Sequence, residues 1–112
     1  MKNTGFTPEV RQIVHWRSGG RCEKCGCKPA IQIHHRQNRG RLGPREGLNE
    51  ASNALDLCLE CHDWIGHNVK KARDELGLAV SFYQNPAETP VHLYDGVFLL
   101  GPDGSKTPTS PL

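Results

Sequence analysis

Two stretches of this sequence, Cys22-Glu23-Lys24-Cys25 and Cys58-Leu59-Glu60-Cys61, decide how the chain folds. Two residues between cysteines let a single turn direct both sulfur atoms toward a common point, and four thiolates at about 2.3 Å satisfy the tetrahedral coordination of zinc. We therefore predict one structural Zn²⁺, bound by Cys22, Cys25, Cys58 and Cys61. The alternative is a redox use of the two pairs, which the lack of a thioredoxin-like order of elements disfavours.

Length and composition describe one small domain without a membrane segment. The chain has 112 residues, 36% hydrophobic and 23% charged, whereas about 150 residues is typical of a domain. The net charge of +2 is too small to indicate a partner. No apolar run approaches the roughly 18 residues of a transmembrane helix, and the polar start of the chain does not resemble a signal peptide. We therefore expect a cytoplasmic location, where structural disulfides are rare. The fifth cysteine, Cys27, is expected to be a free cysteine, and the alternative is that it replaces one of the four zinc ligands.

Hydrophobic periodicity and breaker residues predict an α+β domain. Thr7 and Pro8 are typical of a helix start, and Gly19-Gly20 would end that helix. Asp95-Gly96 favours a type I′ turn and therefore a β-hairpin. The expected elements after the first helix are strands at 30–34 and 55–59 around a loop at 36–52, a helix from Cys61 to Leu76, a strand at 78–83 and the hairpin at 91–100. We expect residues 1–6 to be an N-terminal tail, residues 7–100 to form the domain and residues 101–112, with three prolines, to be a flexible tail.

Histidines and one asparagine lie between and just after the cysteine pairs. His34 and His35 are adjacent on an expected strand, so their side chains should point to opposite faces. His62 directly follows Cys61 at the start of the expected helix, which the zinc knuckle would fix. One ion could then bridge His34 and His62 and keep coordination positions open for a phosphate and water. On spacing alone, these histidines could also be surface residues near a zinc knuckle.

The order of these elements resembles the HNH endonuclease family in its four-cysteine form, in particular the short HNH proteins of tailed bacteriophages. The resemblance extends over about residues 10–80, with a motif core at 22–77, and combines several separated elements in one order. Its elements are the two cysteine pairs, His34-His35-Arg36, the Arg-Gly-rich segment at 39–43, Asn53 and His62-Asp63-Trp64. The resemblance implies a small zinc-stapled ββα-metal domain, or His-Me finger, with a flanking N-terminal helix and a C-terminal β-hairpin.

The resemblance also implies a role for each motif residue. His34 and His62 would bind a catalytic divalent ion, His35 would be the general base, and Asn53 would hold the hairpin loop and orient that base. The family often has an aspartate where this chain has His34. An imidazole favours softer ions over Mg²⁺, so Mg²⁺, Mn²⁺, Ni²⁺ and Zn²⁺ are all candidates. His67 is a weaker candidate ligand, because five residues along a regular helix place it about 140° from His62.

Local charge agrees with a nucleic-acid partner. Arg36, Arg39, Arg41 and Arg45 stand in a stretch without acidic residues, and we expect them to contact phosphates, unless this is merely a solvated basic loop. Arg36, next to the implied base, is expected to contact the scissile or a neighbouring phosphate. The resemblance thus implies a metal-dependent DNA endonuclease that hydrolyses phosphodiester bonds, and by analogy a place in phage genome packaging beside terminase and portal proteins. The alternative is a non-catalytic zinc-stapled module that binds DNA or protein, which would not need the histidine–asparagine set.

Overall fold

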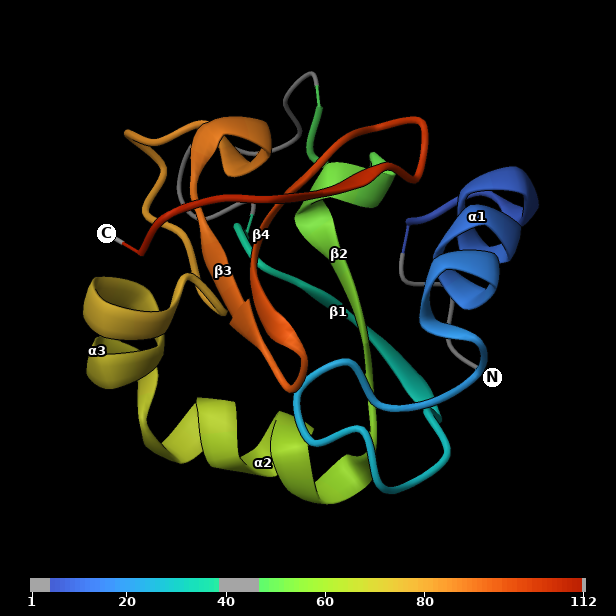
Figure 1. The fold of residues 1–112 in the computed structure, drawn as a ribbon, viewed down its shortest axis with the longest axis horizontal. Helices are drawn as coiled ribbons and strands as arrows, with labels where there is room; N and C mark the ends of the chain where they lie inside the picture. The colour runs from blue at the N-terminus through green and yellow to red at the C-terminus, as the bar shows by residue number, and fades with distance from the viewer. Residues whose placement is uncertain (1–4, 39–46, 112) are drawn as a thin grey trace.

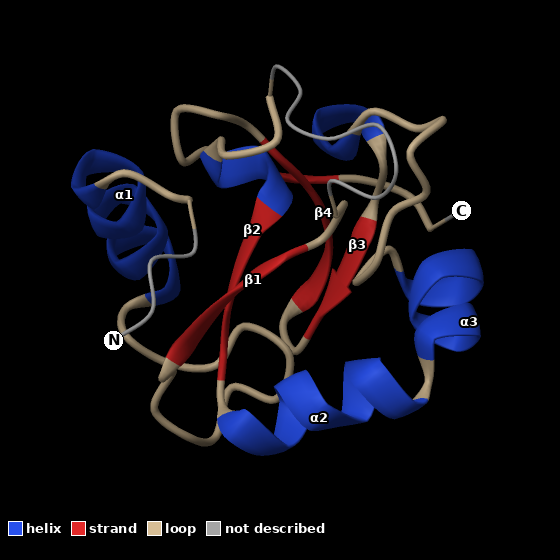
Figure 2. Cartoon of the chain, turned by 180° about the vertical axis from the view of Figure 1, so that it is seen from behind, coloured by secondary structure: helices blue, strands red, loops and turns tan. Residues whose placement is uncertain are grey.

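In the part of the chain that the structure describes, residues 5–38 and 47–111, helices surround two small antiparallel sheets (Figure 1). The coordinates are a computed structural model. The first sheet consists of β1 (Gln32–His35) and β2 (Ala54–Leu57), and the second of β3 (Val91–Leu93), β4 (Gly96–Leu100) and β5 (Lys106–Pro108). Seen from behind in Figure 2, α1 and α3 lie on opposite sides of the sheets, and α2 runs below them. The chain is a small α+β domain, as the sequence predicts.

Helix α1 (Pro8–Ser18) has the ends that the sequence predicts. The Thr7 hydroxyl accepts a hydrogen bond of 3.2 Å from the Val10 N–H, which satisfies one of the free donors of the first turn. Gly19 ends the helix in the left-handed conformation, with φ of 66°. Both signals are local, which is why the sequence alone could locate them.

An apolar cluster and a buried ion pair hold α1 against the β1–β2 hairpin. Arg17 and Glu23 form the ion pair at 2.8 Å, and both side chains are buried. Arg17 also donates to the carbonyl oxygens of Ala51 and Ala54 at 2.9 and 2.7 Å. These additional bonds help to offset the lost hydration of the buried charges. The apolar cluster consists of Phe6, Val14, Ala51 and Ala54.

Strands β1 and β2 form a hairpin that leads directly into α2 (Leu59–His67), and the 3₁₀ turn η2 (Ala51–Asn53) precedes β2. His34 lies opposite Leu55 and His35 opposite Ala54, so the two histidines extend to opposite faces, as predicted. Helix α2 begins earlier than the sequence predicts, because Cys58 is its N-cap.

The predicted single helix from Cys61 to Leu76 is interrupted at Asn68. The Asn68 backbone is not helical (φ −133°, ψ 43°), and its side chain donates to the Trp64 carbonyl oxygen at 2.8 Å. This bond satisfies one of the free carbonyl groups at the end of α2. The chain continues as α3 (Val69–Lys71) and one π-helical turn, η3 (Ala72–Leu76).

Residues 78–83 do not form the strand that the sequence predicts. Gly77 redirects the chain before them: its φ is 67°, and an added Cβ would collide with the Pro90 carbonyl, so the position requires glycine. The Val80 N–H donates to the Arg36 carbonyl oxygen at 2.8 Å, but the chain then reverses in the turn 81–84. The segment is therefore too short to extend a ladder of strand hydrogen bonds.

The predicted hairpin at 91–100 is confirmed, and the 3₁₀ turn η4 (Pro86–Glu88) precedes it. The segment 101–112, expected to be a flexible tail, instead contains β5, in which Lys106 pairs with Leu100 and Pro108 with Phe98. Proline lacks an N–H, but β5 is an edge strand, where a missing donor on the outer side costs no ladder bond. The expectation of a flexible tail, which is based on the three prolines, is therefore wrong for the residues of β5.

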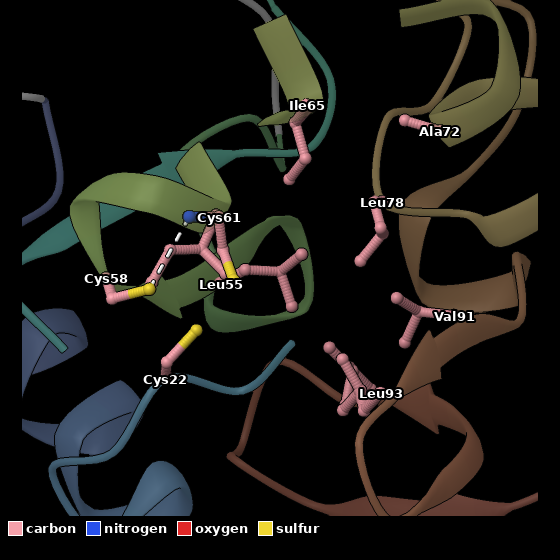
Figure 3. Packing of buried hydrophobic residues seen from close by; sticks show 11 residues of the cluster. Cys22, Leu55, Cys58, Cys61, Ile65, Ala72, Leu78, Val91 and Leu93 are labelled. Carbon is pink, nitrogen blue, oxygen red and sulfur yellow. Dashed lines mark hydrogen bonds between the residues drawn. The ribbon is translucent and has the colours of Figure 1, made fainter. Parts of the chain in front are cut away.

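The main core lies between β2, α2 and the β3–β4 hairpin (Figure 3). Cys22, Cys58 and Cys61 belong to the same buried cluster as Leu55, Ile65 and Leu78. The cysteine cluster is therefore part of the core and not an appendage to it. Among the described residues, no helix is long and apolar enough to cross a membrane.

Candidate functional site

The four predicted cysteines converge. Their sulfur atoms all lie within 4.8 Å of one another, and the Sγ atoms of Cys25 and Cys58 are 4.0 Å apart. Figure 3 shows the sulfurs of Cys22, Cys58 and Cys61 directed toward a common point. A tetrahedron with Zn–S bonds of about 2.3 Å has sulfur–sulfur edges of about 3.8 Å, so the cluster is suited to one structural Zn²⁺.

Backbone hydrogen bonds and burial determine the protonation of the cysteine thiols. The Cys61 N–H donates to the Cys58 sulfur at 3.4 Å. A backbone hydrogen bond from Cys27 lowers the pKa of the Cys25 thiol to about 6, whereas burial raises the pKa of the Cys61 thiol. A buried thiol of this kind loses its proton only when a cation stabilises the thiolate, which is what zinc would do. Cys27 is exposed and its thiol donates to the Cys25 carbonyl oxygen, so it stands outside the four.

His34 and His62 meet on the face of β1 that is turned toward α2. Their ring centroids are 5.5 Å apart, and the rings stand edge-on at 77°. The His34 Nε2–H donates to the Leu78 carbonyl oxygen at 3.0 Å, which places the proton on Nε2 and leaves the lone pair of Nδ1 free. Burial lowers the pKa of His34 to about 4, so the ring is neutral at physiological pH.

His35 lies on the opposite face of β1. Its ring stacks on Phe6 with centroids 4.0 Å apart and an interplanar angle of 16°. Its Nε2–H donates to the Asn49 Oδ1 atom at 2.9 Å. Sequence reasoning missed both partners. The only available signal for Phe6 was a lone aromatic residue just before the capped helix, and nothing distinguished Asn49 from other loop residues.

Asn53 closes the loop between β1 and β2. It is buried, its Oδ1 accepts from the Gln37 N–H at 2.7 Å, and its Nδ2 donates to the carbonyl oxygens of Gln37 (3.0 Å) and Leu48 (2.7 Å). The backbone carbonyl of Asn53 also accepts from the Arg36 N–H at 2.8 Å. The Asn53 side chain thus links the residues just after β1 to those just before β2.

Arg36 does not have the phosphate-contacting position that we expected. Only 2% of its surface is exposed. Its guanidinium donates to four backbone carbonyl oxygens, at 2.8–3.0 Å, which belong to Ser52, Gly77, Pro86 and Thr89. Burial lowers its pKa to about 9, which still leaves it charged at neutral pH. The side chain is a structural cross-link between the end of β1 and three other segments, and all four of these bonds go to backbone carbonyl groups. The other three expected phosphate contacts, Arg39, Arg41 and Arg45, lie outside the described residues.

His67, the weaker candidate ligand, forms its hydrogen bond within α2 and not with His34 or His62. It is exposed at the end of α2, and its Nδ1–H donates to the Asp63 carbonyl oxygen of the same helix at 2.9 Å. Among the described residues, the four cysteines are the one group of three or more potential metal-binding side chains.

Comparison with known proteins adds no further assignment. No family model, curated protein or solved structure matches this chain. Any functional conclusion therefore depends on the site itself and on the order of its residues.

Proposed function

We propose that this chain is a zinc-stapled, metal-dependent DNA endonuclease of the HNH type. The observation that carries the proposal is the pairing of His34 on β1 with His62 on α2, at ring centroids of 5.5 Å. The order β1, β2, α2 supports it, because a hairpin followed by a helix is the topology that the resemblance implies. Asn53, which closes the loop of this hairpin, occupies a loop-holding position of the kind that the family asparagine has.

The histidine pair fits a divalent ion. The Leu78 carbonyl fixes the tautomer of His34 and leaves Nδ1 as the ligand atom, and such a bond from the second ring nitrogen accompanies nearly every histidine ligand of a metal. The His62 backbone N–H donates to the Cys58 carbonyl oxygen at 3.0 Å, whereas among the described residues the His62 ring forms no hydrogen bond and lies edge-on to the His34 ring. His34 and His62 would therefore hold the ion between them. A bound ion would supply positive charge that stabilises the additional negative charge of the attacked phosphate.

His35 is the proposed general base. A neutral imidazole can take a proton from water at neutral pH, so that the resulting hydroxide attacks phosphorus while the bond from phosphorus to the leaving 3′ oxygen breaks. The departing oxygen takes up a proton from water and becomes a 3′ hydroxyl. The bond to Asn49 places the proton of His35 on Nε2 and leaves Nδ1 as the acceptor, while the Phe6 ring restricts the orientation of the imidazole. His34 and His35 leave the same strand end in opposite directions. The proposed mechanism requires a phosphodiester to lie across this strand end, where it must reach the ion and His35 from the two faces of β1.

The test is cleavage of supercoiled plasmid by zinc-loaded protein, with Mg²⁺, Mn²⁺, Ni²⁺ or Zn²⁺ added separately. We compare wild type with His35→Ala and with His92→Ala, a matched control on β3, outside the proposed site. We expect nicked or linear DNA from wild type and His92→Ala, and a loss of at least 100-fold for His35→Ala, as is typical for removal of a general base. Equal zinc content and circular dichroism must show that both variants are folded.

The alternative function is a zinc-stapled module that binds DNA or protein without catalysis. One observation favours it: the cysteine cluster is the one complete metal-binding set among the described residues. Failure of folded, zinc-loaded wild type to cleave with every metal would support this alternative. Cleavage by His35→Ala at the wild-type rate would remove His35 from the mechanism. A role in phage genome packaging with terminase and portal proteins rests on the sequence resemblance alone.

A further inference from the structure

Two large aromatic side chains occupy the tip of a turn. Phe82 and Tyr83 are the central residues of the turn 81–84, and they are 53% and 85% exposed. Their rings lie against each other, with centroids 4.2 Å apart and an interplanar angle of 34°. Turn tips are usually occupied by Gly, Asn, Asp, Ser or Pro. Two adjacent aromatic residues at such a position leave much of their ring surface exposed to solvent.

The backbone under these rings is held firmly. The Gln84 N–H donates to the Ser81 carbonyl oxygen at 3.0 Å and closes the turn. The Gln37 side-chain amide donates to the carbonyl oxygens of both Ser81 and Gln84, each at 2.7 Å. Gln37 itself is 8% exposed and bonds Asn53 through its backbone. The aromatic tip is thus a preorganised surface and not a loose loop, which lowers the entropic cost of binding a ligand to it.

This tip is connected to the strand end that carries His35. Gln37 follows His35 by two residues, a distance of about 7 Å along an extended chain, and its amide contacts the turn directly. The Val80 N–H bonds the Arg36 carbonyl oxygen, which is a second link between the same two segments. In Figure 1 the turn lies in the segment between α3 and β3.

We propose that Phe82 and Tyr83 form a stacking platform for an unpaired base next to the bond that is cleaved. The substrate class would then be DNA with unpaired bases near the target phosphodiester, such as a single strand or a frayed end. This inference rests on the proposed function for the identity of the ligand. An aromatic face stacks on any base and contributes without sequence preference. A base within a duplex is already stacked on its neighbours, so a blunt duplex cannot use the platform.

Binding without cleavage tests the platform. Fluorescence anisotropy is measured with a labelled 12-mer single strand and with the blunt duplex of the same sequence, without added divalent metal, on zinc-loaded protein. We expect Phe82→Ala/Tyr83→Ala to weaken single-strand binding at least about tenfold, in line with the stacking of one or two bases, and to change duplex binding less than twofold. A Phe82→Leu/Tyr83→Leu variant keeps apolar bulk without ring faces and should lose single-strand binding in the same way. Phe82→Tyr should bind like wild type.

Trp16→Ala is the matched control, because Trp16 is 78% exposed but lies on α1, away from this turn. It should bind both DNAs like wild type. The platform would be overturned if the Ala variant lost single-strand and duplex binding equally, or if the Leu variant kept single-strand binding. It would also be overturned if Trp16→Ala showed the same loss, or if wild type did not bind DNA. Unchanged binding in the Ala variant would also overturn it and would leave the pair as a docking surface for a protein.

The platform and the nuclease can fail separately. Single-strand binding that depends on Phe82 and Tyr83, in a protein that cleaves with no metal, would leave the platform standing and refute the endonuclease. Plasmid cleavage that requires His35, together with wild-type DNA binding by the Ala variant, would refute the platform alone.

Discussion

Arg36→Ala should unfold or nearly unfold this domain, although Arg36 stands beside the proposed general base. The guanidinium is buried and gives hydrogen bonds to the carbonyl oxygens of Ser52, Gly77, Pro86 and Thr89. These acceptors come from three segments that are distant from Arg36 in the sequence, because Pro86 and Thr89 both belong to the turn η4 and its C-cap. Removal of the side chain leaves all four carbonyl groups without this donor and opens a cavity among them.

The magnitude follows from the number and kind of these bonds. A hydrogen bond to a charged group contributes about 1.5–3 kcal/mol, so four would contribute about 6–12 kcal/mol if they were additive. Bonds that share one side chain are not additive, and a small domain has only about 5–15 kcal/mol of total stability. We therefore expect a loss of at least about 4 kcal/mol for Arg36→Ala. Arg36→Lys retains the charge but not the planar fork, and should lose about 2–3 kcal/mol.

The assay is urea unfolding of zinc-loaded protein, followed by tryptophan fluorescence and circular dichroism. Arg73→Ala is the matched control, because Arg73 is partly exposed and pairs with its sequence neighbour Asp74, at 3.0 Å. It should change the free energy of unfolding by less than about 0.5 kcal/mol. A loss below about 1 kcal/mol for Arg36→Ala would refute the reasoning.

Two further predictions concern the cysteine cluster and the histidine pair. Cys58→Ser should lose zinc and show a large fall in melting temperature, whereas Cys27→Ser should keep its zinc and its melting temperature. Zinc content and thermal unfolding are the measurements. A Cys58→Ser variant that is free of zinc but as stable as wild type would contradict a structural role for the ion. Burial lowers the pKa of His34 to about 4, below the ordinary 6.5, so between these pH values the unfolded chain binds a proton that the folded chain does not. The free energy of unfolding should therefore fall by up to about 3 kcal/mol as the pH drops from 6.5 to 4, and His34→Gln should lack this portion of the fall. An NMR titration of the His34 ring with a midpoint near 6.5 would contradict it.

Features that short sequence patterns determine were predictable. The two-residue spacing of the cysteines is sufficient to predict their convergence, and the alternation of a strand places His34 and His35 on opposite faces. Thr7 and Gly19 mark the ends of α1 because capping depends on one or two neighbouring residues. In each case the physical cause lies within a few positions of the pattern.

Features that depend on distant partners could not be predicted in this way. An arginine beside two histidines in a basic stretch indicates phosphate binding, and no local signal shows that four distant carbonyl groups surround Arg36. The stacking of Phe6 on His35 joins the start of α1 to the end of β1. Strand β5 exists because Lys106 to Pro108 meet an available edge of β4, not because of their own propensity.

The β1–β2 hairpin is fixed at both ends by different chemistry, and this division bears on the proposed site. At one end, Leu57 pairs with Gln32 and is followed directly by Cys58, so the cysteine cluster holds that end. At the other end, the side chains of Arg36 and Asn53 bind backbone groups and hold the residues that directly follow His35. Zinc loss should therefore reduce activity by unfolding the chain. By contrast, a change at Asn53 that leaves the protein folded should alter the position of His35 and lower the cleavage rate with zinc still bound.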